Sequence, residues 1–129
     1  MRILDSDHCI AILRKRLDLR EHVPPDEELA TTAISVAELT HGAQRSQRRD
    51  DNLARLEVLL SALAILPFDE SAARRFGRLK ADLEAAGTPL DDMDLQIASI
   101  ALENHLPLLT NNTKHFERIQ GLELQNWLG

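Results

Sequence analysis

Three acidic residues adjoin apolar segments in three different parts of the chain. Asp5 comes directly after a short apolar run. Glu38 lies one helical turn after Ile34, and Asp94 lies one turn before Ala98. Carboxylates that gather at one place repel each other unless a cation neutralises them. Oxygen ligands favour Mg²⁺ or Mn²⁺, which bind substrate phosphates and activate water, so the chemistry favoured by such a cluster is hydrolysis of a phosphodiester bond.

Some of these acids also have a purely structural interpretation. Asp5, Ser6 and Asp7 are all good helix N-caps, and only one of them is needed for that purpose. Ser35 and Glu38 have the spacing of a capping box, in which the glutamate bonds back to the backbone of the cap residue. Local capping and a shared metal site therefore both remain open from the spacing alone.

Short apolar runs alternate along the chain with stretches whose apolar residues have helical spacing. The predicted strands are residues 2–5, 29–32, 64–66, 106–109 and an edge strand at 122–124. The predicted helices are residues 7–19, 35–41 closed by Gly42, 49–63, 70–86 closed by Gly87, 93–104, and a short turn that contains His115 and Phe116.

This alternation predicts an α/β fold in a single domain spanning residues 1–129. We expect a central, mainly parallel sheet of about four to five strands with helices on both faces. Ligands of such sheets bind in the crevice at the carboxyl ends of the strands. Asp5 and the oxygen donors Asn111 and Asn112 would lie there, because each follows a predicted strand.

Composition narrows the class of protein. The formal net charge of −6 argues against a broad basic surface that holds duplex nucleic acid. One cysteine excludes a disulfide framework and a multi-cysteine zinc site, and we expect Cys9 to be a small buried hydrophobe. No apolar run is long enough to cross a bilayer, and no secretory signal is recognisable, so we expect a cytoplasmic protein.

Four segments in this order carry a family resemblance: ILDSDH, ISVAELTHG, MDLQIASIAL and LLTNNTKHFERIQGLELQNW. With them the chain resembles the PIN-domain proteins of the VapC type, the toxin halves of bacterial toxin–antitoxin pairs. The resemblance covers essentially the whole sequence, and the last two segments are the most specific. It implies a three-layer α/β/α fold and an endoribonuclease that depends on Mg²⁺ or Mn²⁺.

The resemblance also assigns residues and partners. Asp5, Glu38 and Asp94 match the acidic catalytic and metal-binding positions, and Asp7 matches a supporting one. Asn112 stands where the family often has a fourth acid, so we expect at most a supporting role for it. The family implies an RNA substrate, a homodimer and a VapB-type antitoxin whose tail, often through an arginine, occupies the acidic cleft.

Two alternatives from other classes remain. An asparagine at position 112 keeps open a catalytically weak or inactive PIN-like module that only docks a protein partner. A phosphoacceptor receiver domain is also α/β with clustered acids, and Asp69, just after a predicted strand, could be taken for the phosphoacceptor. Asp69 equally has the position of an N-cap for the helix that follows it.

Overall fold

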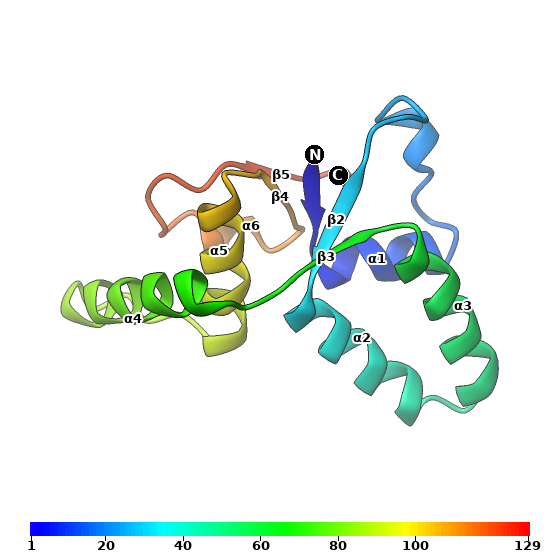
Figure 1. The fold of residues 1–129 in the computed structure, drawn as a ribbon, viewed down its shortest axis with the longest axis horizontal. Helices are drawn as coiled ribbons and strands as arrows, with labels where there is room; N and C mark the ends of the chain where they lie inside the picture. The colour runs from blue at the N-terminus through cyan, green and yellow to red at the C-terminus, as the bar shows by residue number, and fades with distance from the viewer.

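Five parallel strands form one sheet in the order β3-β2-β1-β4-β5 (Figure 1). The structure is a computed structural model that describes residues 1–129. The strands are β1 (Arg2–Leu4), β2 (Leu29–Thr32), β3 (Ala64–Leu66), β4 (Leu108–Leu109) and β5 (Leu124–Gln125). The expected parallel α/β sheet is therefore confirmed, and the edge strand begins two residues later than predicted.

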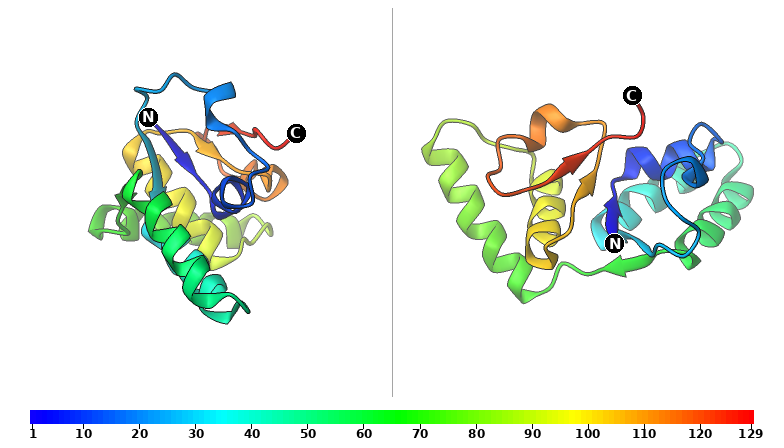
Figure 2. Two further views of the ribbon diagram at one scale, coloured as in Figure 1. Left: turned by 90° about the vertical axis from the view of Figure 1, so that its right-hand side faces the viewer. Right: turned by 90° about the horizontal axis from the view of Figure 1, so that it is seen from above.

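Helices cover both faces of this sheet and make it the middle of three layers (Figure 1). They are α1 (Ser6–Leu13), the short 3₁₀ helix η1 (Leu19–Glu21), α2 (Ala33–Arg45), α3 (Arg49–Ser61), α4 (Glu70–Ala85), α5 (Asp92–Asn104) and α6 (Thr113–Phe116). Viewed from above, α4 and α3 lie at opposite ends of the molecule (Figure 2). None of the helices is long and apolar enough to span a membrane.

Two apolar cores lie on the two faces because successive strand residues point in opposite directions. Ile3 packs into the core shared with α4, α5 and α6, whereas Leu4 packs into the core shared with α1, α2 and α3. Cys9 is fully buried in the second core, as expected, and burial raises the pKa of its thiol to about 12. The strands are thus buried on both sides, as is typical of parallel sheets.

Side-chain N-caps mark where most of the helices begin. The side chains of Asp69 and Asp91 accept hydrogen bonds from backbone N–H groups at the starts of α4 and α5. Asp69 is therefore an N-cap, which gives it a structural role in place of the phosphoacceptor role of a receiver domain. At the start of α1 the cap is Asp5, and Asp7 lies in the first turn instead of capping.

Two predicted helices have the wrong ends. The helix predicted over residues 7–19 stops at Leu13, because Lys15 takes the left-handed conformation (φ 58°) and Arg16 N–H bonds back to the Ala11 carbonyl. Leu17 is still buried, but from the connecting segment. The second helix does not close at Gly42; it runs on to Arg45, since glycine is tolerated inside a helix that is otherwise well supported.

Two glycines in or next to α4 both leave room for a Cβ atom, but only one of them has a positive φ angle. A Cβ atom at Gly77, inside α4, or at Gly87, after its end, would meet no atom within 4 Å. Gly87 has φ 74°, a conformation that costs other residues about 1 kcal/mol. We expect Gly77→Ala to raise the free energy of unfolding by roughly 0.5–1 kcal/mol and Gly87→Ala to lower it by about as much. Urea unfolding of the two variants measures both; equal effects would contradict the C-cap assignment.

Candidate acidic site

The order of the strands fixes where a ligand can bind. From β1 the chain moves outward through β2 to β3 and then returns to β4 on the other side of β1. The crossovers on the two sides of β1 therefore leave a crevice between the carboxyl ends of β1 and β4. Asp5 directly follows β1, and Thr110 directly follows β4, so both side chains lie at this point.

Asp5 is held rigidly at the bottom of the crevice and is only 6% exposed. One carboxylate oxygen accepts from the backbone N–H of Ser6 (2.8 Å), and the other accepts from the Thr110 hydroxyl (2.8 Å). Burial, together with the nearby charge of Asp7, raises the pKa of Asp5 to about 6 despite these bonds. Asp5 therefore serves as a helix cap and as part of the acidic cluster at once.

Asp7 has a different environment, in which its oxygens are used by structural partners. One oxygen contacts His8 Nδ1 at 2.7 Å, and the other accepts from the backbone N–H of Asn111 at 2.8 Å. Although burial raises the pKa of Asp7, the bonds from His8 and Asn111 hold it below the usual range. His8 Nε2 in turn accepts from the backbone N–H of Trp127, so Asp7 ties α1 to β4 and to the C-terminal segment.

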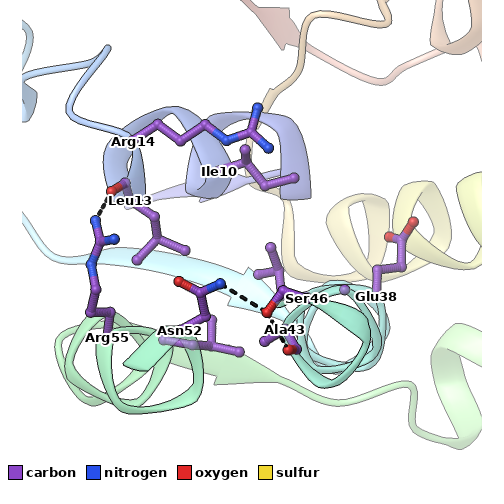
Figure 3. Close-up of a pocket in the computed structure, with 11 residues that line it drawn as sticks. Ile10, Leu13, Arg14, Glu38, Ala43, Ser46, Asn52 and Arg55 are labelled. Atoms are coloured by element: carbon purple, nitrogen blue, oxygen red, sulfur yellow. Dashed lines mark hydrogen bonds between the residues drawn. The ribbon is translucent and has the colours of Figure 1, made fainter. Parts of the chain in front are cut away.

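Glu38 projects from the second turn of α2, and no hydrogen bond fixes it. Thr32, not Ser35, caps this helix, so the capping box suggested by the spacing does not form. Glu38 Oε1 is buried and has no hydrogen-bond partner. Burial and the charges of Asp5 and Asp94 raise the pKa of Glu38 to about 7. Figure 3 shows its carboxylate pointing away from Asn52 and Arg55.

Asp94 lies in the first turn of α5, ahead of the buried residues Ala98 and Ala101 as predicted. Burial and the neighbouring charge of Asp91 raise its pKa, and His115 opposes that change. His115 Nδ1 is 3.6 Å from Asp94 Oδ2. His115 therefore lies beside the acidic cluster, although the sequence provided no metal-ligand spacing that would have selected it.

Asn112 does not reach the acids directly. Its side-chain amide contacts His115 Nδ1 at 2.7 Å, and its backbone N–H donates to the Thr110 hydroxyl at 3.0 Å. Sequence reasoning missed both Thr110 and His115. Thr110 could have been selected because it directly follows a predicted strand. For His115 the sequence offered only its spacing of one helical turn from Asn112.

The electrostatic coupling of the acids shows that they share one region. The charges of Asp5 and Asp94 raise the pKa of Glu38, and that of Asp94 also raises the pKa of Asp5. As the side chains stand, no three His, Cys, Asp or Glu residues converge closely enough to hold a metal ion. One or two carboxylates with water suffice for Mg²⁺, and the unpartnered Glu38 oxygen is a free ligand atom. The donor set therefore fits a hard cation.

Comparison with known proteins places this site in a family. The PIN domain profile matches residues 2–122. Ribonuclease VapC2 of Rickettsia felis is 33% identical over 97% of this chain and 96% of its own length. The tRNA(fMet)-specific endonuclease VapC of Shigella flexneri is 34% identical over the same shares.

Solved structures agree with the sequence relatives. A chain of the DNA-bound VapBC complex from Salmonella typhimurium matches with a TM-score of 0.90 and 33% identity over 98% of this chain and 99% of that one. VapBC-5 from Mycobacterium tuberculosis, described as a member of the VapBC family of toxin-antitoxin systems, matches with a TM-score of 0.71 and 30% identity over 97% and 95%. This chain belongs to the PIN-domain family, in its VapC-type group.

The raised pKa values of Asp5 and Glu38 predict how stability depends on pH without metal. Between about pH 4 and about pH 7 the folded chain binds more protons at these sites than the unfolded chain does. The free energy of unfolding should therefore fall as pH rises through this range. Urea unfolding of Glu38→Gln should show a flatter pH dependence, while Asp82→Asn, at an exposed position of α4, should not. An unchanged slope in Glu38→Gln would refute the assignment.

Proposed function

We propose that this protein is a metal-dependent endoribonuclease that acts as the toxin of a VapBC-type pair. The observation that carries the proposal is the coupling of three acids: the charges of Asp5 and Asp94 raise the pKa of Glu38, and Glu38 keeps a buried oxygen without a partner. Its relatives over the full chain length are named ribonucleases or endonucleases, which supports the same activity.

Asp5, Glu38 and Asp94 are the residues that would hold Mg²⁺ or Mn²⁺. Such an ion supplies charge neutralisation and a more acidic bound water for attack on a phosphodiester. Asp7 contributes indirectly, because its bonds to His8 and Asn111 fix the start of α1 and the end of β4. This is the supporting role that we propose for Asp7.

Thr110, Glu38 and Asp94 have different roles in the proposed reaction. Thr110 donates to Asp5 and leaves that carboxylate in one orientation. Glu38 has no hydrogen-bond partner on its buried oxygen, which leaves that oxygen free to hold the ion or its bound water. The side chain of Asp94 is 21% exposed, so an ion held there stays accessible to a phosphate of the RNA.

The name of the Shigella relative makes initiator transfer RNA the first substrate to test. We expect the purified chain to cleave an RNA of this kind with Mg²⁺ or Mn²⁺ and to stop in EDTA. Asp94→Asn should lower the rate by about 10²-fold or more, because a ligand to the ion is lost. It should also abolish toxicity in cells. Gel assays of RNA cleavage and growth assays of cells that express the variant measure the two effects.

A matched control separates catalysis from folding. Asp82→Asn removes an exposed acid of α4 and should leave the cleavage rate unchanged. Asp94→Asn should melt no lower than the natural chain, since the pKa of Asp94 is raised in the folded state. A toxic, well-folded Asp94→Asn variant would remove this residue from the catalytic set. Intact RNA in both metals would favour the alternative of a PIN-like module that only docks a partner.

For the antitoxin we propose a groove beside the acidic site. A cavity of about 250 Å³ lies between α1, α2 and α3, and Glu38 lines one end of it (Figure 3). Its walls carry four leucine or isoleucine side chains and two arginines: Ile10, Leu13, Leu39, Leu56, Arg14 and Arg55. Arg55 donates to the Leu13 carbonyl and joins α3 to α1 across the groove. An apolar antitoxin segment fits these walls, and an arginine on it would reach the acids.

Gly42 lines this groove and allows a clean test. A Cβ atom there meets nothing within 4 Å, so alanine is sterically allowed, and a larger side chain would extend into the space that the groove provides. Gly42→Trp should fill the groove and weaken antitoxin binding in calorimetry by at least about tenfold, while metal-dependent cleavage remains. Gly42→Ala should bind normally and stabilise α2 by roughly 0.5–1 kcal/mol.

Normal antitoxin binding by a folded Gly42→Trp variant would exclude this groove. The antitoxin for the assay is the product of the small reading frame expected beside this gene. The homodimer implied by the resemblance stays a prediction, which light scattering on the purified toxin and on the complex tests directly.

A further inference from the structure

His115 is the imidazole that faces the acidic cluster from α6. Its Nδ1 lies 3.6 Å from Asp94 Oδ2, and its side chain is 52% exposed. That separation is somewhat longer than a hydrogen bond, for which the distance from nitrogen to oxygen is about 2.7–3.2 Å. Hydrogen bonds at catalytic sites are often long before the substrate complex forms.

A chain of contacts fixes where His115 stands. Thr110 donates to Asp5 and accepts from the backbone N–H of Asn112. The Asn112 amide contacts His115 Nδ1 at 2.7 Å, and the His115 backbone N–H bonds to the Asn112 carbonyl at 3.1 Å. The loop after β4 therefore holds both the Asp5 carboxylate, through Thr110, and the His115 imidazole, through Asn112. His115 thus links Asp5 and Asp94, two acids whose charges repel each other.

Other basic groups at this end of the molecule have different partners. Lys80 is bound to Asp92 at 3.0 Å, and Arg118 donates to the Pro89 carbonyl at 2.9 Å. Asp91, the N-cap residue of α5, carries a charge that repels Asp94 and raises its pKa. His115 is thus the side chain available to donate a hydrogen bond to Asp94.

We propose that His115 is a positioning residue for Asp94, with Asn112 holding the imidazole in place. In the productive arrangement the single hydrogen on Nδ1 lies between two acceptors, the Asp94 carboxylate and the Asn112 amide oxygen, after the Asn112 amide group turns over. This inference rests on the proposed function, because it gives Asp94 its orientation as a metal ligand. Groups that orient a metal ligand commonly change metal affinity by about 10- to 100-fold.

Calorimetric titration of the full chain with Mn²⁺ tests the proposal. His115→Ala should bind Mn²⁺ about tenfold more weakly, and His115→Gln, whose amide also donates, should recover much of the loss. Lys114→Ala removes the neighbouring exposed base of α6 and should bind like the natural chain. Thermal melts confirm that each variant is folded.

A double-mutant cycle tells positioning from independent action. If His115 acts through Asp94, then His115→Ala adds no further loss of Mn²⁺ affinity to Asp94→Asn. Additive losses, or a His115→Ala variant that binds as tightly as the natural chain, would overturn the proposal. A natural chain that binds no Mn²⁺ would instead remove the proposed metal chemistry.

A second measurement needs no metal. Long-range ¹H–¹⁵N spectra report which ring nitrogen of His115 carries the hydrogen, and the signals of the metal-free chain should change in Asp94→Asn and in Asn112→Ala. They should not change in Lys114→Ala. His115 signals that are indifferent to Asp94→Asn would show that the two side chains do not interact, and would overturn the proposal whatever the metal affinity.

Discussion

The hydrogen bond from the Thr110 hydroxyl to Asp5 holds the crevice together. It joins the residues that follow β1 and β4. These are neighbouring strands of the sheet, and β2 and β3 lie on one side of this pair while β5 lies on the other. Asp5 also accepts from Ser6, and its backbone N–H donates to the Leu109 carbonyl. Burying a carboxylate is unfavourable unless its oxygens accept hydrogen bonds. The bonds to Asp5 therefore offset the free energy of its burial and fix the orientation of its side chain.

The other acids differ in whether hydrogen bonds compensate for the burial of their charge. Asp7 has structural partners on both oxygens, and its pKa is lowered. Glu38 has a buried oxygen with none, and its pKa is raised by burial and by its acidic neighbours. The folded chain is therefore under electrostatic strain at one place, which a bound cation would relieve. This asymmetry is the physical basis for proposing a metal at the crevice and a structural role for Asp7.

Local sequence signals were reliable where one interaction decides the outcome. Asp69 caps α4 as its position suggested, since an N-cap needs only its own following N–H groups. The capping box at Ser35 and Glu38 failed because Thr32 begins α2 earlier, after a strand whose end is set by pairing with its neighbours. Gly42 likewise lies inside a helix that packing against α3 extends beyond it.

The sequence by itself determined the parallel α/β class and the family resemblance, and it named three acids as candidates, because alternating apolar runs, family motifs and helical spacing are patterns along the chain. Only the tertiary structure decided what surrounds them. It showed Asp5 acting as a cap within the cluster, Asn112 turned toward His115, and His115 beside Asp94. These contacts join α1, α5 and the loop after β4, and such pairings depend on strand order and helix packing, which no spacing along the chain encodes.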